Sequence, residues 1–274
     1  MTTNGATPAP EEPVKLLWTS GWDSTFRLLD LVLVRHRAVQ PYYFVLERAS
    51  AAIERHTMER IKARLFSRWP QARGLVMETV VVRMDDVPPD RDAWAALSRL
   101  RAMGGARRVG GQYYELAAAA KHLDLADLEV GIHFEPGASW LAQLAANVEE
   151  RDGVCRLAPH PEPRELEVFR RFAFPLLTLS KKDMAARAET GGFAELLEMT
   201  WFCHTPDRRG RPCGLCAPCR LTMSEGLGRR IPAVNRIKHR LLWPAIRVLT
   251  RLGARRRGRA VWNRLHRLGG RGSK

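Results

Sequence analysis

Short apolar runs alternate with segments of helical periodicity over most of the chain. The apolar runs are rich in Val, Leu and aromatic residues, as expected of buried strands, and they cover residues 14–18, 42–46, 77–83 and 128–132. Apolar positions recur at helical spacing over about residues 24–37, 51–68, 91–103, 112–123 and 138–149. Strands that alternate with helices are typical of crossover connections. The pattern predicts an α/β fold with a parallel sheet and helices on both faces.

The pattern changes towards the C-terminus. A further helix is expected from Ser180, because Ser180 and Asp183 have the spacing of a capping box. After Gly192 the periodicity gives way to a stretch rich in Cys, Gly and Pro. We therefore expect four parts: a loose Pro-rich leader, a main α/β domain, a small metal-binding module and a C-terminal extension, over residues 1–13, 14–192, 193–228 and 229–274.

Composition narrows the class of protein. A chain of 274 residues with 45% hydrophobic residues is long enough to bury a substantial core. Its first thirteen residues have neither the basic start nor the apolar stretch of a signal peptide. No apolar run approaches the roughly 18 residues that cross a bilayer. These features predict a cytoplasmic protein.

The positive charge is concentrated in the C-terminal extension. Residues 229–274 contain 15 Lys and Arg and no Asp or Glu, against a net charge of +16 for the whole chain. Apolar residues recur there at helical spacing, Trp243 and Trp262 are added, and Pro244 is expected to kink or split the helix. Such a segment suits an anionic membrane surface, a nucleic acid or an acidic protein. The alternative is a solvated basic extension without a partner.

A cluster of small and hydroxyl residues follows the first expected strand. It consists of Thr19, Ser20, Gly21, Trp22, Asp23, Ser24 and Thr25. Gly21 allows an unusual backbone conformation, and small residues before a helix let backbone amides approach an anion. An Asp at this place would repel phosphate, so Asp23 is expected to hold Mg²⁺ or to orient the loop. The alternative is an ordinary capped helix start.

Four cysteines in the expected small module have metal-ligand spacing. They are Cys203, Cys213, Cys216 and Cys219, spaced C-x9-C-x2-C-x2-C. Four thiolates close a tetrahedral zinc site and leave no position for water, which predicts a structural Zn²⁺. Disulfides are the alternative, but nothing in the sequence indicates an oxidising compartment. Cys155 stands apart and is expected to be a small buried residue.

These motifs together resemble a known family. "TSGWDST" resembles the Ser-Gly-Gly-x-Asp-Ser loop of the PP-loop ATP pyrophosphatase superfamily. "TWFC" with "CGLCAPCRL" resembles the zinc motif of the 7-cyano-7-deazaguanine synthase family, which makes a queuosine precursor. "FPLLTLSKKDMA" resembles the segment that carries the family's lysine and acid, which places them at Lys181 and Asp183. The resemblance covers about residues 14–225 in the family's order.

The resemblance implies an ATP- and Mg²⁺-dependent ligase. Enzymes of this family adenylate a small-molecule carboxylate with release of pyrophosphate, and ammonia then displaces AMP. A second activation turns the amide into a nitrile. The resemblance implies that Thr19 to Thr25 bind the phosphates of ATP and that Asp23 and Lys181 act in catalysis. A homodimer is one of the expected assemblies.

Departures from the family's pattern leave the substrate open. Thr19 and Ser20 stand where the family has Ser and Gly, and Gln112 stands in place of an Arg. The family's Ser-Gly-Tyr-Pro-Asp segment is missing after the fourth strand, where Glu135 is either a guanine-binding carboxylate or an ordinary loop acid. The alternatives are 7-carboxy-7-deazaguanine or a related acid, a tRNA substrate with the basic extension on RNA, and a degenerate nucleotide-binding adaptor targeted by that extension.

Overall fold

The computed structural model describes residues 11–46, 49–103, 109–133 and 139–251. Glu135 and Trp262, and most of the expected leader, lie outside these residues. The chain forms two compact units, residues 1–201 and 202–274. Residues 193–201, expected in the small module, therefore belong to the first unit, where Phe193, Leu196 and Leu197 are buried in the core.

A seven-stranded sheet is the centre of the first unit, with strand order β3-β2-β1-β4-β7-β6-β5. The pairs β1–β2, β2–β3, β1–β4 and β4–β7 are parallel, which confirms the parallel core of the predicted sheet. The strands are β1 Val14–Leu17, β2 Val39–Val45, β3 Val80–Arg83, β4 Leu128–Glu129, β5 Val148–Arg151, β6 Val154–Leu157 and β7 Phe172–Phe174.

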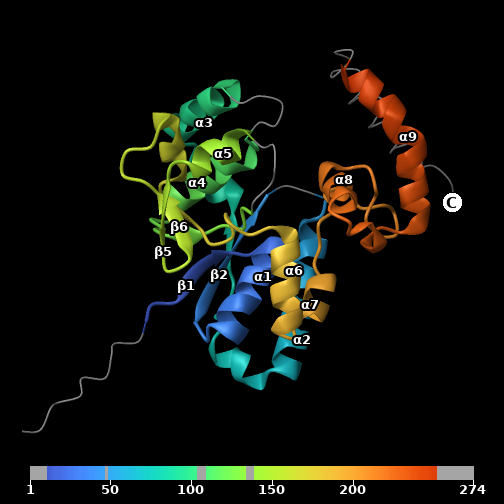
Figure 1. Ribbon diagram of the computed structural model, residues 1–274, viewed down its shortest axis with the longest axis horizontal. Coiled ribbons are helices and arrows are strands. Elements are labelled where there is room, and N and C mark those ends of the chain that lie inside the picture. The colour runs from blue at the N-terminus through green and yellow to red at the C-terminus, as the bar shows by residue number, and fades with distance from the viewer. Residues whose placement is uncertain (1–10, 47–48, 104–108, 134–138, 252–274) are drawn as a thin grey trace, which may run out of the picture. The chain divides into compact units, whose positions relative to one another are not determined.

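Helices cover both faces of this sheet, as predicted (Figure 1). One buried cluster joins the sheet to α1, α2, α6 and α7, and a second joins it to α3, α4, α5 and the 3₁₀ segment Arg164–Phe169. The helices are α1 Trp22–Leu29, continued as a π-helix over Asp30–Val34, then α2 Ala51–Arg68, α3 Arg91–Met103, α4 Gln112–His122, α5 Ser139–Ala145, α6 Lys181–Thr190 and α7 Ala194–Glu198.

One edge of the sheet differs from the prediction. β5 and β6 form an antiparallel hairpin, and β6 runs antiparallel to β7. The hairpin turns at Asp152 and Gly153, which have positive φ values of 56° and 74°. Asp-Gly is a strong hairpin signal because both positions of such a turn need positive φ. The end of the expected helix 138–149 is thus the start of a strand.

The second unit contains α8 Ala217–Ser224, a 3₁₀ turn Gly228–Arg230 and the long helix α9 Ala233–Arg251. Pro244 lies inside α9 and does not split it, contrary to one of the two expectations. Among the described residues, no helix is both long and apolar enough to cross a membrane.

Candidate functional site

The turn between β1 and α1 has its strained residue at Ser20. Ser20 has a φ of 56°, whereas Gly21 has φ −71° and ψ 163°, an ordinary extended conformation. The expectation that Gly21 supplies the unusual backbone is therefore wrong. A residue with a Cβ adopts this left-handed region only at a cost, so the geometry of the turn imposes it on Ser20. Strain held at one residue of a loop is a common feature of binding sites.

Hydrogen bonds within the turn fix its shape. Thr19 N–H donates to Ser24 Oγ at 3.2 Å, and the hydroxyls of Thr19 and Ser24 lie 3.4 Å apart. Thr25 is fully buried and accepts a bond from Trp18 Nε1 at 3.0 Å, so its side chain holds the turn together. Ser20 Oγ is also buried and has no hydrogen-bond partner among the described residues. An orphaned buried hydroxyl indicates a missing ligand or water.

The start of α1 lacks a side-chain cap. Gly21 is the N-cap residue and offers no acceptor to the first-turn amides. Uncapped N–H groups at a helix start form a favourable site for an anion. The chain that leaves β4 passes close by: a Cβ on Gly131 would lie 3.1 Å from both Asp23 Cβ and Ser24 N. Gly131 therefore lets two segments of the chain approach each other at the candidate site.

Asp23 and Lys181, both proposed from the sequence, are in direct contact. Lys181 Nζ donates to Asp23 Oδ1 across 158 positions of sequence, and His133 Nδ1 lies 3.4 Å from Asp23 Oδ2. Burial by itself would raise the pKa of Asp23, but the charge of Lys181 and the hydrogen bond from His133 outweigh it and hold that pKa at about 2. Asp23 is thus a carboxylate at neutral pH, with a cation beside the uncapped helix start.

Lys181 owes its position to the start of α6. Ser180 Oγ accepts a hydrogen bond from Asp183 N–H at 3.2 Å, and the Asp183 carboxylate accepts from Ser180 N–H at 2.8 Å. This is the predicted capping box, and it fixes the first turn of α6. Asp183 therefore serves the helix start, and Lys181, its first residue, is turned to Asp23.

A buried ion cluster holds α1 against β4. Arg27 Nε and Nη2 donate to the two oxygens of Glu129, both at 2.7 Å, and Nη1 donates to Asp30 at 2.9 Å. Burial by itself would lower the pKa of Arg27, but the bonds to Glu129 raise it above its usual range. Because Arg27 follows Asp23 on α1 and Glu129 precedes Gly131, the pair links both sides of the candidate site.

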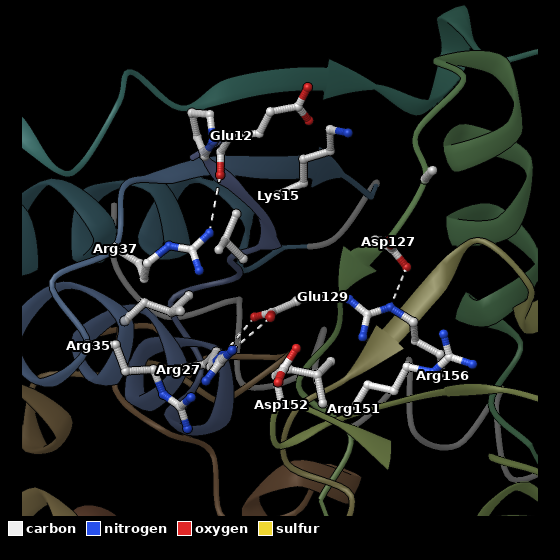
Figure 2. Close-up of a pocket in the computed structure, with 15 residues that line it drawn as sticks. Glu12, Lys15, Arg27, Arg35, Arg37, Asp127, Glu129, Arg151, Asp152 and Arg156 are labelled. Atoms are coloured by element: carbon white, nitrogen blue, oxygen red, sulfur yellow. Dashed lines mark hydrogen bonds and ion pairs between the residues drawn. The ribbon is translucent and has the colours of Figure 1, made fainter. Parts of the chain in front are cut away.

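The same pair forms one wall of a cavity of about 430 Å³ at the amino ends of β1 and β4. Figure 2 shows Arg27 facing Glu129 on one side and Arg156 bonded to Asp127 on the other. Acidic and basic side chains both line this cavity, and most of the bases are paired with neighbouring acids. The Thr19 to Thr25 turn lies at the opposite, carboxyl end of β1. Ligands of open parallel sheets bind at carboxyl ends, which favours the turn as the main site.

In the second unit, the four predicted cysteine ligands come together. Their sulfur atoms all lie within 4.8 Å of one another, and none of the five cysteines is in a disulfide. The Cys213–Cys219 and Cys216–Cys203 sulfur pairs are 3.9 and 3.8 Å apart. A tetrahedral zinc site with Zn–S bonds of about 2.3 Å needs sulfur separations of about 3.8 Å. The donor set therefore fits Zn²⁺.

Backbone amides surround these sulfur atoms. Leu215 N–H and Cys216 N–H donate to Cys213 Sγ at 3.4 and 3.3 Å, and Cys213 N–H donates to Cys203 Sγ at 3.3 Å. Hydrogen bonds to sulfur favour the thiolate, the form that binds metal. These amides therefore support the metal-binding form of Cys203 and Cys213.

The start of α9 supports the cysteine loop. Gly214 has a φ of 77°, and a Cβ there would lie 2.4 Å from Asn235 O. Asn235 Nδ2 donates to Pro212 O at 2.8 Å and to Asp207 Oδ2 at 3.0 Å. The segment 229–274, expected as an appended extension, therefore begins with residues that pack on the metal-binding loop.

Sequence reasoning missed three contributors to the first site. His133, Gly131 and the Arg27–Glu129 pair are ordinary residues in a single sequence, and only the fold brings them beside Asp23. The signal for His133 was its place directly after the expected strand 128–132, because side chains at the carboxyl ends of parallel strands face a common edge. Cys155, by contrast, is buried in β6 as expected, and burial raises the pKa of its thiol.

A mostly parallel α/β sheet with a Ser/Gly/Asp turn after its first strand, together with a four-cysteine cluster, is consistent with a PP-loop type of fold. In a comparison with known families, residues 117–227 match the family described as queuosine biosynthesis protein QueC. This match covers less than half of the chain; it includes His133, Lys181 and the four cysteines and does not reach residues 19–25. A search of curated proteins finds no significant match.

Proposed function

We propose that this protein is an ATP-dependent carbon–nitrogen ligase that activates a carboxylate as its adenylate. The observation that carries the proposal is the contact of Lys181 with Asp23 beside the uncapped start of α1. The start of α1 has no side-chain cap and follows the orphaned hydroxyl of Ser20 directly in sequence, and the partly buried cation Lys181 contacts Asp23 in its first turn. This combination suits the phosphates of a nucleotide. The QueC-family match supports ATP as the nucleotide.

The proposed reaction has two stages. A carboxylate oxygen of the substrate attacks the α-phosphorus of ATP, the bond to the bridging oxygen breaks, and pyrophosphate leaves. Ammonia or another amine then attacks the carbonyl carbon of the acyl adenylate, and AMP leaves with loss of a proton, which gives an amide. A second adenylation at the amide oxygen, followed by loss of AMP and a proton, gives a nitrile. The proposed substrate is 7-carboxy-7-deazaguanine or a related acid.

The residues of the turn have distinct roles in this proposal. The first-turn amides of α1, Trp22 included, and the hydroxyls of Thr19, Ser20 and Ser24 bind phosphate oxygens, and Thr25 holds the turn. Lys181 offsets negative charge as it develops on the pyrophosphate. Asp23 provides one carboxylate oxygen for Mg²⁺, which proteins usually bind through one or two carboxylates together with substrate phosphates. Mg²⁺ neutralises phosphate charge when it is bound.

The four cysteines are proposed to hold a structural Zn²⁺. All four ligand positions would be filled by sulfur, so no position would remain for a reactive water. The bound ion would link distant parts of the loop 203–219. Its contribution is folding free energy of the second unit, since such sites exist only when the chain around them is folded.

Two alternatives are less well supported. A PP-loop enzyme that transfers sulfur to tRNA needs a reactive cysteine outside the zinc set, and the remaining cysteine, Cys155, is buried with a raised pKa. A degenerate adaptor has no need of a partly buried lysine in contact with an Asp, yet Lys181 has this contact with Asp23. The first observation disfavours sulfur transfer to tRNA, and the second disfavours a non-catalytic adaptor.

Mass spectrometry of the products tests this proposal. The purified protein is incubated with ATP, Mg²⁺, 7-carboxy-7-deazaguanine and ammonium, and the expected products are pyrophosphate, AMP and the amide or nitrile of the acid. Bulk tRNA replaces the acid in a parallel reaction. Products from tRNA alone would contradict the small-molecule substrate, and no pyrophosphate with either substrate would contradict the ligase. The matched control is Asp85→Asn, an exposed acid outside the site, which should behave as the parent.

A further inference from the structure

Helix α9 has one face that packs on its own unit. Asn235 is buried and bonded to Asp207 and Pro212, as described above. One turn further along α9, the ring of His239 stacks on the ring of Trp243, with 5.8 Å between the ring centroids. The guanidinium carbon of Arg220 lies 4.0 Å from the centroid of the same Trp243 ring. The side of α9 that carries Asn235, His239 and Trp243 is therefore in contact with the rest of the second unit.

The opposite face is apolar and exposed. Val234, Ile237 and Leu241 are exposed by 56%, 56% and 73% of their surface. Their spacing of three and four residues places them in one row along the helix. At 100° per residue, Ile237 lies about 200° around the axis from Asn235 and Leu241 about 240°. The row therefore points away from the packed face.

Basic residues flank this apolar row. Arg236 and Arg240 lie on one side of it and Lys238 on the other, and the described part of α9 contains no Asp or Glu. The surrounding segment 229–274 has 15 Lys and Arg and no acid. An apolar stripe between basic flanks is the pattern of helices that lie in the interface of an anionic bilayer.

We propose that this face of α9, Val234, Ile237 and Leu241 with Arg236, Lys238 and Arg240, docks on an anionic lipid surface. Basic residues alone would suit a nucleic acid equally well, but single strands are bound by exposed aromatic platforms, and the ring of Trp243 is already in contact with Arg220 and His239. Aliphatic side chains in a row gain nothing from a phosphate backbone, whereas they gain free energy by entering the acyl boundary of a membrane. The exposed face therefore fits lipid best.

Vesicle co-sedimentation of the full chain tests this inference. The protein should bind vesicles of phosphatidylcholine mixed with phosphatidylglycerol and not vesicles of phosphatidylcholine alone, and binding should weaken as salt rises. The double variant Ile237→Ser, Leu241→Ser should bind at least about tenfold more weakly, because two aliphatic side chains no longer enter the bilayer. The matched control is Val34→Ser, a residue of similar exposure in the first unit, which should bind like the parent.

Other outcomes would overturn the proposal. Unchanged vesicle binding by the double variant would show that charge alone is responsible, and equal binding to both vesicle types would remove the role of the basic flanks. RNA binding that depends on Ile237 and Leu241 would point to a different partner. A dimer of the parent that the double variant loses would identify a second copy of the chain as the occupant. Unchanged thermal unfolding and metal content of the variants establish that each loss is a loss of docking.

Discussion

The cysteine cluster and the Asp23 site are built in opposite ways. The four cysteines lie within residues 203–219. Their loop turns at Gly214, which has a positive φ, and backbone amides of the same loop donate to the sulfur atoms. Asp23 meets Lys181 across 158 positions and His133 across more than a hundred, and a buried ion pair behind them joins α1 to β4. A local site depends on its metal, whereas a dispersed site depends on the fold that gathers it.

Loss of one metal ligand should have the largest effect. Cys216→Ser should reduce zinc from about one ion per chain to nearly none and should destabilise the second unit, because structural zinc contributes about 10–16 kcal/mol of apparent binding free energy in small domains. Metal analysis and thermal unfolding measure both. Cys155→Ala is the matched control and should keep its zinc. Full zinc retention by a folded Cys213→Ser, Cys216→Ser double variant would disprove the assignment.

Breaking the buried Arg27–Glu129 ion pair should cause the next largest loss, a loss of stability in the first unit. Glu129→Ala leaves Arg27 buried with Asp30 as its remaining partner, and removal of one member of a buried pair costs about 3–5 kcal/mol. Denaturant unfolding measures this loss. The control is Glu195→Ala, which breaks an exposed pair with Arg68 and should change stability little. Equal losses of unfolding free energy in Glu129→Ala and Glu195→Ala would show that the buried ion pair contributes no more than an exposed one.

Acid should weaken the Asp23 site by a smaller amount. The pKa of Asp23 is about 2 when folded against 3.8 for an ordinary Asp. Because the folded value is the lower one, the ionised group stabilises the fold above pH 3.8, by about 2 kcal/mol, and this contribution is lost as pH falls towards 2. Asp207 in the second unit also has a pKa of about 2. Burial by itself would raise this pKa, but hydrogen bonds from backbone N–H groups and from the Asn235 side chain lower it by more.

Lys181 should affect the pKa of only one of these two carboxylates. Lys181→Ala should raise the pKa of Asp23 towards its ordinary value and leave that of Asp207 unchanged, since only Asp23 has Lys181 as a partner. Carboxyl chemical shifts followed through an acid titration report both groups. An unshifted Asp23 in the variant would show that Lys181 does not stabilise its charge.

The sequence predicted what depends on local chemistry. Cysteine spacing is set by the ligand geometry, and the capping box at Ser180 lies within four residues, so both could be read directly. Residues whose role depends on tertiary contacts could not. His133 and Glu129 gain theirs from β4, and Ser20 takes the strained backbone that the sequence assigned to Gly21 because the turn geometry overrides residue preference. The hairpin β5–β6 was missed although its Asp-Gly turn was visible.

Lys181 beside Asp23 is proposed to serve the chemistry of ATP, and a comparison of two adjacent lysines tests this role most directly. Lys181 is the first residue of α6 and contacts Asp23, whereas Lys182 is exposed. Pyrophosphate release from ATP in the presence of the acid substrate is measured for Lys181→Ala and for Lys182→Ala. We expect Lys181→Ala to lose activity about a hundredfold or more, as when a charge-stabilising contact is removed, and Lys182→Ala to stay within about twofold of the parent. Equal activity of the two variants would contradict the claim.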